Sequence, residues 1–231
     1  MDTMNKLLKF RQTDEQKVYF VSDLHHYHNP KWKVPLWEQR GYKDVNEMNE
    51  DQIDTINKIV RPNDILWHLG DLTLNCSESP FEEFITRLQC QNIYCLWGNH
   101  NSPTWNVYQR EIQKVQEFLK SVYNNSEPME IYPLRYRNLV FFGNQQEITV
   151  DGQYIILGHY PIYVFNHMKD GAWHLCGHSH YNLPFSKVEN LESKILDVGW
   201  DGKLSPYSMD ELRAIMNKKN VFQSGDHHTN D

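Results

Sequence analysis

Residues 18–25 read VYFVSDLH, a short apolar run that passes directly into Asp23 and His25. The length of the run and its β-branched and aromatic residues predict a buried strand. A strand that ends in a carboxylate and an imidazole brings two metal-binding side chains to one point. In an extended segment residues i and i+2 point the same way, so we expect Asp23 and His25 to reach a single ion together.

The same kind of ending recurs along the chain. Four further predicted strands end in Asp, His or Asn beside a glycine, and the carboxyl ends of strands line the ligand crevice of α/β sheets. One such ending has an ordinary structural explanation, but five are hard to explain as coincidence. The four endings are Gly70-Asp71, Gly98-Asn99-His100, Gly158-His159 and Gly177-His178-Ser179-His180.

Strand and helix patterns alternate in the first half of the chain, which predicts the α/β class. The middle, 131–199, is rich in strand patterns and contains the turn sequence Asp151-Gly152, which predicts hairpins and a second sheet. The expected strands are 18–23, 64–71, 92–99, 139–142, 154–159, 173–178 and 194–199. The expected helices are 45–60, 79–89, 105–122 and 209–218, with capping boxes from Ser79 to Glu82 and from Ser208 to Glu211.

Length and charge narrow the class of protein. The 231 residues suit one large domain, which we expect to span 1–222 before a disordered tail at 223–231. The net charge of −7 has the wrong sign for a basic nucleic-acid-binding surface, so stable nucleic-acid binding is not expected. The chain has no apolar run long enough for a membrane span and no signal-peptide pattern, so we expect a cytoplasmic protein with reduced cysteines. The oligomeric state stays open.

The candidate ligands are nitrogen and oxygen donors, without a thiolate. Such a set suits Mn, Fe, Zn, Co or Ni rather than Cu(I) or a structural cysteine zinc site. Asp71 is the only acid among the central strand ends, and a carboxylate has two oxygens with which to bridge two ions. Two neighbouring ions about 3.5–4 Å apart, bridged in this way, form a dinuclear centre.

The motifs SDLH, GDL, GNH, GHYP and GHSH, in this order over residues 22–180, resemble the signature blocks of the calcineurin-like metallophosphoesterase superfamily. His28, EMNE at 47–50, HLGD at 68–71 and LDVGWD at 196–201 further resemble its small bacterial and phage branch. The resemblance implies a four-layer αββα sandwich in which two mixed β-sheets are flanked by helices. It also implies a dinuclear metal centre at the strand C-terminal ends and hydrolysis of phosphate mono- or diesters.

Carried over by motif, the resemblance also implies a role for each residue. A metal-bridging hydroxide would attack phosphorus in line, and His100 would protonate the leaving alkoxide or stabilise the transition state. The implied ligands are Asp23, His25 and His180 for one ion, Asn99, His159 and His178 for the other, and Asp71 as the bridge.

Three residues near these motifs are weaker candidates for substrate binding. Asn101 stands where many relatives carry an acid, and a neutral amide would orient His100 or hold it protonated less well. Tyr27 stands where the branch often has glycine, so its ring would narrow access or stack on a base. His28 would touch substrate phosphate or, equally, stabilise its loop through a hydrogen bond.

Two functions of different classes follow from these observations. The favoured one is a metal-dependent phosphodiesterase acting on a small phosphate ester or nucleotide, cyclic nucleotides included, because His100 is present to assist an alkoxide leaving group. The alternative is a non-catalytic metal-binding scaffold on the same fold, and a phosphomonoesterase or protein phosphatase shares the same residue set.

Overall fold

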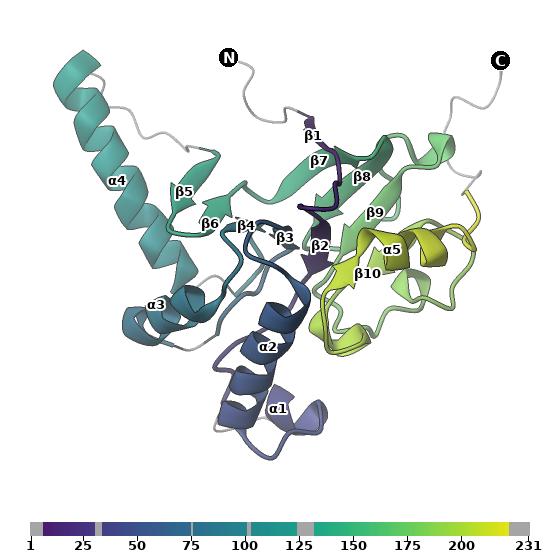
Figure 1. Ribbon diagram of the computed structural model, residues 1–231, viewed down its shortest axis with the longest axis horizontal. Helices are drawn as coiled ribbons and strands as arrows, with labels where there is room; N and C mark the ends of the chain where they lie inside the picture. Colours follow the sequence, from purple (N-terminus) through teal and green to yellow (C-terminus); the bar gives the residue numbers. More distant parts are fainter. Residues whose placement is uncertain (1–6, 31–33, 75, 101–102, 124–131, 222–231) are drawn as a thin grey trace.

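The structure is a computed structural model that describes residues 7–30, 34–74, 76–100, 103–123 and 132–221. Two mixed β-sheets lie at its centre (Figure 1). The six-stranded sheet has the order β11 (Tyr207–Ser208), β2 (Val18–Val21), β3 (Ile65–His68), β4 (Asn92–Cys95), β6 (Leu139–Phe141) and β5 (Leu134–Tyr136). The five-stranded sheet has the order β1 (Leu8–Phe10), β7 (Gln145–Val150), β8 (Gln153–Gly158), β9 (Trp173–Cys176) and β10 (Ile195–Asp197).

Helices flank the sheets, as the predicted sandwich requires. Each predicted helix is present within two residues of its expected bounds. The helices are α1 (Leu36–Gln39), α2 (Val45–Ile59), α3 (Glu78–Arg87), α4 (Thr104–Tyr123) and α5 (Met209–Met216), with 3-10 turns η1 (Met168–Asp170), η2 (Pro184–Ser186) and η3 (Trp200–Gly202).

All seven predicted strands are present, and the Asp151-Gly152 turn joins β7 to β8 as an antiparallel hairpin. Four strands, β1, β5, β7 and β11, were not predicted individually. Three of them are only two or three residues long, and so short a segment carries no periodic signal. The short helix α1 is missing from the prediction for the same reason.

Parallel pairing aligns the strand ends that carry the candidate ligands. In the six-stranded sheet Val21 pairs with His68 and His68 with Cys95, so β2, β3 and β4 end at one edge. In the five-stranded sheet β8 and β9 are also parallel, with Leu157 opposite Leu175. The sequence that follows each of these strands therefore emerges on the same side of its sheet.

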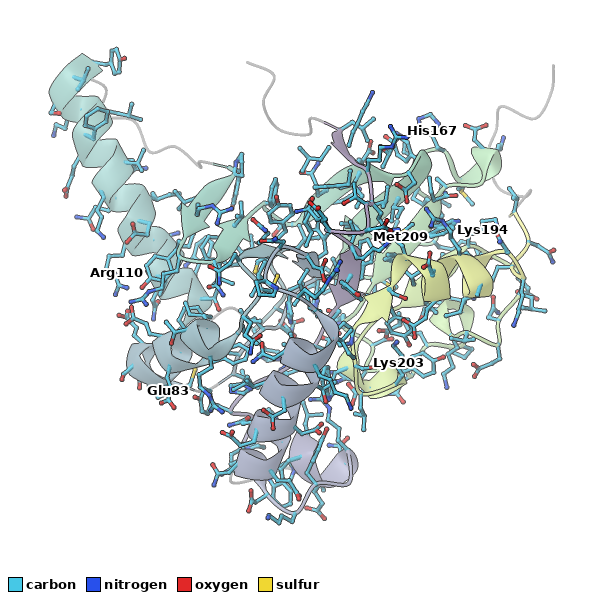
Figure 2. The ribbon with its side chains drawn as sticks, in the orientation of Figure 1. Glu83, Arg110, His167, Lys194, Lys203 and Met209 are labelled. Carbon is cyan, nitrogen blue, oxygen red and sulfur yellow. The ribbon has the colours of Figure 1, made fainter. Side chains whose placement is uncertain are left out.

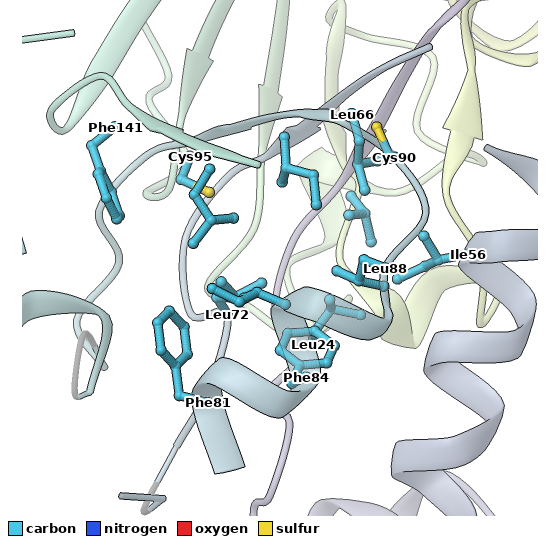
Figure 3. Close-up of a cluster of buried hydrophobic side chains, with 14 of the residues drawn as sticks. Leu24, Ile56, Leu66, Leu72, Phe81, Phe84, Leu88, Cys90, Cys95 and Phe141 are labelled. Carbon is cyan, nitrogen blue, oxygen red and sulfur yellow. The ribbon is translucent and has the colours of Figure 1, made fainter. Parts of the chain in front are cut away.

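Two hydrophobic cores hold these layers together. The first lies between the six-stranded sheet and helices α2, α3 and α4, where Ile56, Phe84 and Leu66 are buried (Figure 3). The second lies between the two sheets, where Trp67 and Leu157 are buried among side chains of both sheets and of α5. A fully buried side chain of this size contributes about 1.5–3 kcal/mol, so the two cores fix the relative positions of the strand ends.

One of the two predicted capping boxes is present. The Ser208 hydroxyl accepts from the Glu211 amide, and the Glu211 carboxylate accepts from the Ser208 amide. The box expected from Ser79 is wrong, because α3 already begins at Glu78 after Ser77. Pro80 then stands within the first turn, where its missing N–H costs no helical hydrogen bond.

Helix α4 is only half packed. Val107 and Ile112 on its predicted apolar face are buried, but Phe118 is 62% exposed and Val122 is exposed as well. Figure 1 shows the reason: the helix extends past the rest of the molecule, so its last turns have no sheet beneath them.

Within the described residues, no helix is both long and apolar enough to cross a membrane. Of the cysteines, Cys90, Cys95 and Cys176 are buried and all four are free. The predicted disordered tail lies outside the described residues.

Candidate metal centre

Five of the seven candidate ligands have left-handed backbone conformations, which are uncommon for residues other than glycine. Asp23 has φ 54° and His25 has φ 47°, so the segment after β2 is not extended. The reasoning that placed these two side chains together by strand alternation is therefore wrong, although the side chains do meet. Strained backbone of this kind clusters at functional sites, where the surrounding fold holds it. The other three residues are Asp71, His178 and His180.

The first group of candidate ligands comprises Asp23, His25 and His180. Each offers one ligand atom, and these atoms lie within 4.8 Å of one another. The His25 Nε2 atom is 3.7 Å from Asp23 Oδ1, and the His25 and His180 rings stack with centroids 4.9 Å apart. Residues from the ends of β2 and β9, 155 or more positions apart in sequence, thus converge as the motifs predict.

The second group forms around the Asn99 side chain. Its Oδ1 atom lies 2.9 Å from His159 Nε2 and 2.8 Å from His178 Nδ1. The other ring nitrogen of His159, Nδ1, donates to the Leu69 carbonyl at 2.9 Å. This leaves Nε2 as the atom that can coordinate a metal ion. The strand ends of both sheets therefore contribute to this group.

Asp71 lies between the two groups. Its Oδ2 atom is 3.4 Å from His25 Nε2 and 3.5 Å from His159 Nε2, while its Oδ1 atom accepts from the His100 amide at 2.7 Å. Burial acts to raise the pKa of Asp71, but its interactions with His159 and His25 outweigh burial and hold the pKa below its usual range. One carboxylate oxygen thus faces a histidine of each group while the other is fixed by the backbone.

The buried polar atoms of the first group fit divalent cations. Asp23 Oδ1 and both ring nitrogens of His25 are buried, and none of them has a hydrogen-bond partner among the described residues. Leaving such atoms unpaired is costly, and buried carboxylates and imidazoles that converge in this way are usually paired or coordinate metals. Two ligands about 2.0–2.2 Å from one ion lie about 3–3.5 Å apart, close to the spacing around Asp71 Oδ2.

Glycine gives the carboxylates room. A Cβ atom on Gly98 would stand 2.6 Å from the Asp71 amide nitrogen and would overlap the Asp71 carboxylate. A Cβ atom on Gly177 would overlap the Asp23 carboxylate and the Ser22 side chain in the same way. The glycine beside the ligand in these motifs is therefore required by close approach of a neighbouring strand end.

Arg40 and Asp201 support the first group, and neither was singled out from the sequence. Asp201 Oδ2 is 2.9 Å from His180 Nδ1, and its two oxygens accept from Arg40 at 2.9 and 2.8 Å. The buried Arg40 guanidinium also donates to the carbonyls of Asp23 and Leu24, at 2.7 and 2.9 Å. The pair therefore ties the backbone at Asp23 to the ring of His180. Asp201 belongs to the LDVGWD motif, which is the signal that sequence reasoning could have used.

Replacing Asp201 with Asn is expected to weaken metal binding by the first group about 10–100-fold, because the residue orients the His180 ring. Competition against a chelating dye measures this affinity in the folded protein without any assay of activity. Asp210→Asn, which changes an exposed acid of α5, is the control. An unchanged affinity in Asp201→Asn would show that the ring is oriented without this carboxylate.

The three weaker candidates fare differently. His28 Nδ1 accepts from the Leu36 amide at 3.1 Å, so its loop-stabilising alternative is present. The Tyr27 hydroxyl donates to the Pro80 carbonyl at 3.0 Å and its ring packs against His26, which turns the side chain toward α3. Asn101 lies outside the described residues.

Three other histidines, His68, His167 and His174, are not among the candidate ligands, and the sequence favours a buried core residue with satisfied ring nitrogens for each of them. His174 is buried and hydrogen bonded through both ring nitrogens, as expected. His68 is buried, but neither nitrogen has a hydrogen-bond partner among the described residues, so the expectation of a satisfied side chain is wrong. His167 lies at the periphery, exposed and paired with Asp170 rather than in the core (Figure 2).

The cluster opens to solvent on one side. Asp23, His25, Asp71 and His159 are buried, whereas Asn99, His100 and His178 are exposed. The His100 ring lies 5.5 Å from the His25 ring, at the exposed rim. A small anion approaching from this side would meet the candidate ligands and His100 together.

Comparisons with known proteins agree with this architecture. A solved structure from Aquifex aeolicus, a protein of unknown function named AQ665, has the same fold, with a TM-score of 0.56, 18% identity and coverage of 87% of this chain and 99% of that one. An uncharacterized protein of Methanocaldococcus jannaschii, MJ1445, is 31% identical over 86 residues, which are 37% of this chain. The chain spans about half the length of that relative, 47% of it.

A family model described as calcineurin-like phosphoesterase matches residues 16–182, well over half of the chain. The matched segment contains all of the candidate ligands and His100. Enzymes of this kind use two divalent metal ions, and two groups of side chains could each hold one: Asp23 with His25 and His180, and Asp23 with Asp71 and His159. The chain belongs to the calcineurin-like phosphoesterase family.

Proposed function

We propose that the chain hydrolyses phosphodiesters of small molecules, nucleotides and cyclic nucleotides among them, at a centre of two divalent ions. Mn, Fe, Zn, Ni or Co would suit the nitrogen and oxygen donors. One ion would be held by Asp23, His25 and His180, the other by Asn99, His159 and His178, with Asp71 shared between them.

The position of Asp71 carries this proposal. Its Oδ2 atom is almost equidistant from His25 and His159, one histidine from each group, at 3.4 and 3.5 Å. Because His25 and His159 belong to different sets of candidate ligands, a carboxylate between them can be shared by two ions. The shared position favours a dinuclear centre over one structural ion, and dinuclear centres are typical of phosphoester hydrolysis.

The chemistry that two bound ions supply is activation of water as a nucleophile and neutralisation of charge on phosphoryl oxygens. The protein's residues provide the rest. Two buried carboxylates, four imidazoles and the Asn99 side chain would hold the ions. Because the net charge of the chain is −7, an anionic substrate would be attracted by this centre rather than by an extended basic surface.

His100 is the proposed proton donor. Its amide is fixed by Asp71 Oδ1 at 2.7 Å, and its ring stands at the exposed rim beside His25. From there an imidazolium can give its proton to a departing alkoxide. A leaving group that needs such help is typical of phosphodiesters of alcohols, and for this reason we favour diesters over monoesters.

An assay of two chromogenic esters tests the proposal. The purified chain is incubated with bis-p-nitrophenyl phosphate or p-nitrophenyl phosphate, with Mn²⁺, Ni²⁺ or Mg²⁺ added or with excess chelator. We expect metal-dependent turnover with the diester preferred, and loss of activity in chelator that returns on adding metal. Faster turnover of the monoester would indicate a phosphomonoesterase, and no turnover with any metal would favour the non-catalytic scaffold.

A further inference from the structure

Tyr160 stands at the open side of the candidate centre. Its ring lies 4.7 Å from the ring of His178 and 5.1 Å from that of His159, both of them candidate ligands of the second group. The residue is nevertheless 51% exposed. A large aromatic side chain that contacts the site and still presents much of its surface to solvent is suited to contact a ligand.

Pro161 and the buried side chain of His174 restrain the segment that carries Tyr160. Pro161 follows it and restricts the backbone of Tyr160 to extended conformations. Buried His174 donates from Nδ1 to the Ile156 carbonyl at 3.1 Å and accepts at Nε2 from the Ile162 amide at 3.0 Å. Burial lowers the pKa of His174 to about 4, which keeps the ring in the neutral form that these two bonds require. Tyr160 is thus presented on a fixed backbone, and a preorganised contact loses little entropy on binding.

Tyr160 and His100 flank different ligand groups. His100 contacts His25, whereas Tyr160 contacts His159 and His178, and Asp71 Oδ2 lies between His25 and His159. A phosphate bound by ions beside Asp71 would therefore have His100 on one side and Tyr160 on the other. A monoester carries one organic group, but a diester carries two, so that one can leave beside His100 while the other is retained beside Tyr160.

We propose that Tyr160 is a specificity residue that stacks on the retained group of a phosphodiester, and that this group is an aromatic nucleoside. The proposal rests on the proposed phosphodiesterase function. A nucleobase fits because stacking on an aromatic side chain contributes about 1–3 kcal/mol per base in single-stranded nucleic-acid complexes. Tyr160 would contact only the flat face of the base. The contact therefore favours nucleotides over aliphatic esters but does not distinguish one base from another.

Two diesters with the same leaving group test the proposal. Thymidine 5′-(p-nitrophenyl phosphate) retains a nucleoside, whereas methyl p-nitrophenyl phosphate retains a methyl group. Tyr160→Leu is expected to lower the ratio of kcat/KM for the nucleoside ester to that for the methyl ester about tenfold, chiefly through KM of the nucleoside ester. Tyr160→Phe keeps the ring and should restore the ratio.

Tyr163→Leu is the matched control. Tyr163 is 50% exposed, close to the value for Tyr160, but its ring packs against Phe185, 5.9 Å away. We expect this variant to keep both activities and their ratio. An equal loss on both esters in Tyr160→Leu would indicate displacement of His178 instead of a lost stacking contact, and would overturn the proposal, as would an unchanged ratio.

Equilibrium binding separates this inference from the proposed function. Calorimetric titration with thymidine 5′-monophosphate should give about tenfold weaker binding to Tyr160→Leu than to the wild type, while Tyr163→Leu matches the wild type. Absence of turnover in the wild type would defeat the proposed function, yet this titration would still decide the role of Tyr160. Equal affinities in the wild type and Tyr160→Leu would overturn that role.

Discussion

Asp71→Asn is expected to abolish metal-dependent hydrolysis, with a fall in kcat of at least about a thousandfold. The Oδ2 atom of Asp71 faces both His25 and His159, at 3.4 and 3.5 Å. A neutral amide lacks the negative charge that lets a carboxylate bridge two cations. Metal ions supply several kcal/mol of transition-state stabilisation, and each 1.36 kcal/mol is a factor of ten in rate.

Metal content tests the cause of this loss. Elemental analysis after gel filtration should find close to two ions per chain in the wild type and one or none in Asp71→Asn. Because ligands that bind only the folded state stabilise it, added Mn²⁺ should raise the melting temperature of the wild type more than that of the variant. Asp54→Asn, an exposed acid of α2, is the control. Two ions retained in Asp71→Asn would contradict a shared carboxylate.

The composition of the candidate centre was predictable, whereas its backbone was not. Each ligand follows a recognisable strand, and parallel strands end at one edge, so proximity within each sheet follows from pattern and topology, whereas the grouping across the two sheets came from the family resemblance. The left-handed conformations of Asp23 and His25 were not predictable, because a strand pattern gives no information on the turn that follows it. The side chains of Asp23 and His25 lie together because of these left-handed conformations and not because of strand alternation.

The supporting residues escaped prediction because their contacts are distant in sequence. Arg40 and Asp201 are 161 residues apart, and neither carries a local pattern that indicates the other. Their proximity depends on how α1 and η3 pack against the strand ends, which is a matter of tertiary structure.

The glycines show the opposite case. Gly98 was recognised as part of a motif, but the need for it, clearance for the Asp71 carboxylate, is visible only when β3 and β4 lie side by side.

The left-handed backbone conformations of the ligands and the space left by the neighbouring glycines together explain why the motifs are short and sharply defined. A tight turn directly after the strand brings the carboxylate or imidazole back over the sheet edge, where a neighbouring strand end already lies. Only a residue without a side chain leaves space there. The pairing of glycine with a ligand is therefore a structural requirement at Gly70, Gly98 and Gly177, whereas a Cβ atom on Gly158 would meet only ordinary contacts of 3.6 Å or more.

His100→Ala is expected to lower kcat about 10²–10⁴-fold for a diester with an alkoxide leaving group, such as a dinucleoside phosphate. The loss should be much smaller for thymidine 5′-(p-nitrophenyl phosphate), because p-nitrophenolate is weakly basic and departs without a proton. Metal content should stay at the wild-type value, since the backbone amide that holds Asp71 Oδ1 is retained in alanine.

The comparison of leaving groups identifies what His100 does. His167→Ala removes an exposed histidine at the periphery and should behave as the wild type with both esters. Equal losses on the two esters in His100→Ala would assign the residue to electrostatic stabilisation of the transition state, because that effect does not depend on the basicity of the leaving group. No loss on either ester would remove His100 from catalysis and leave proton delivery to solvent at the open rim.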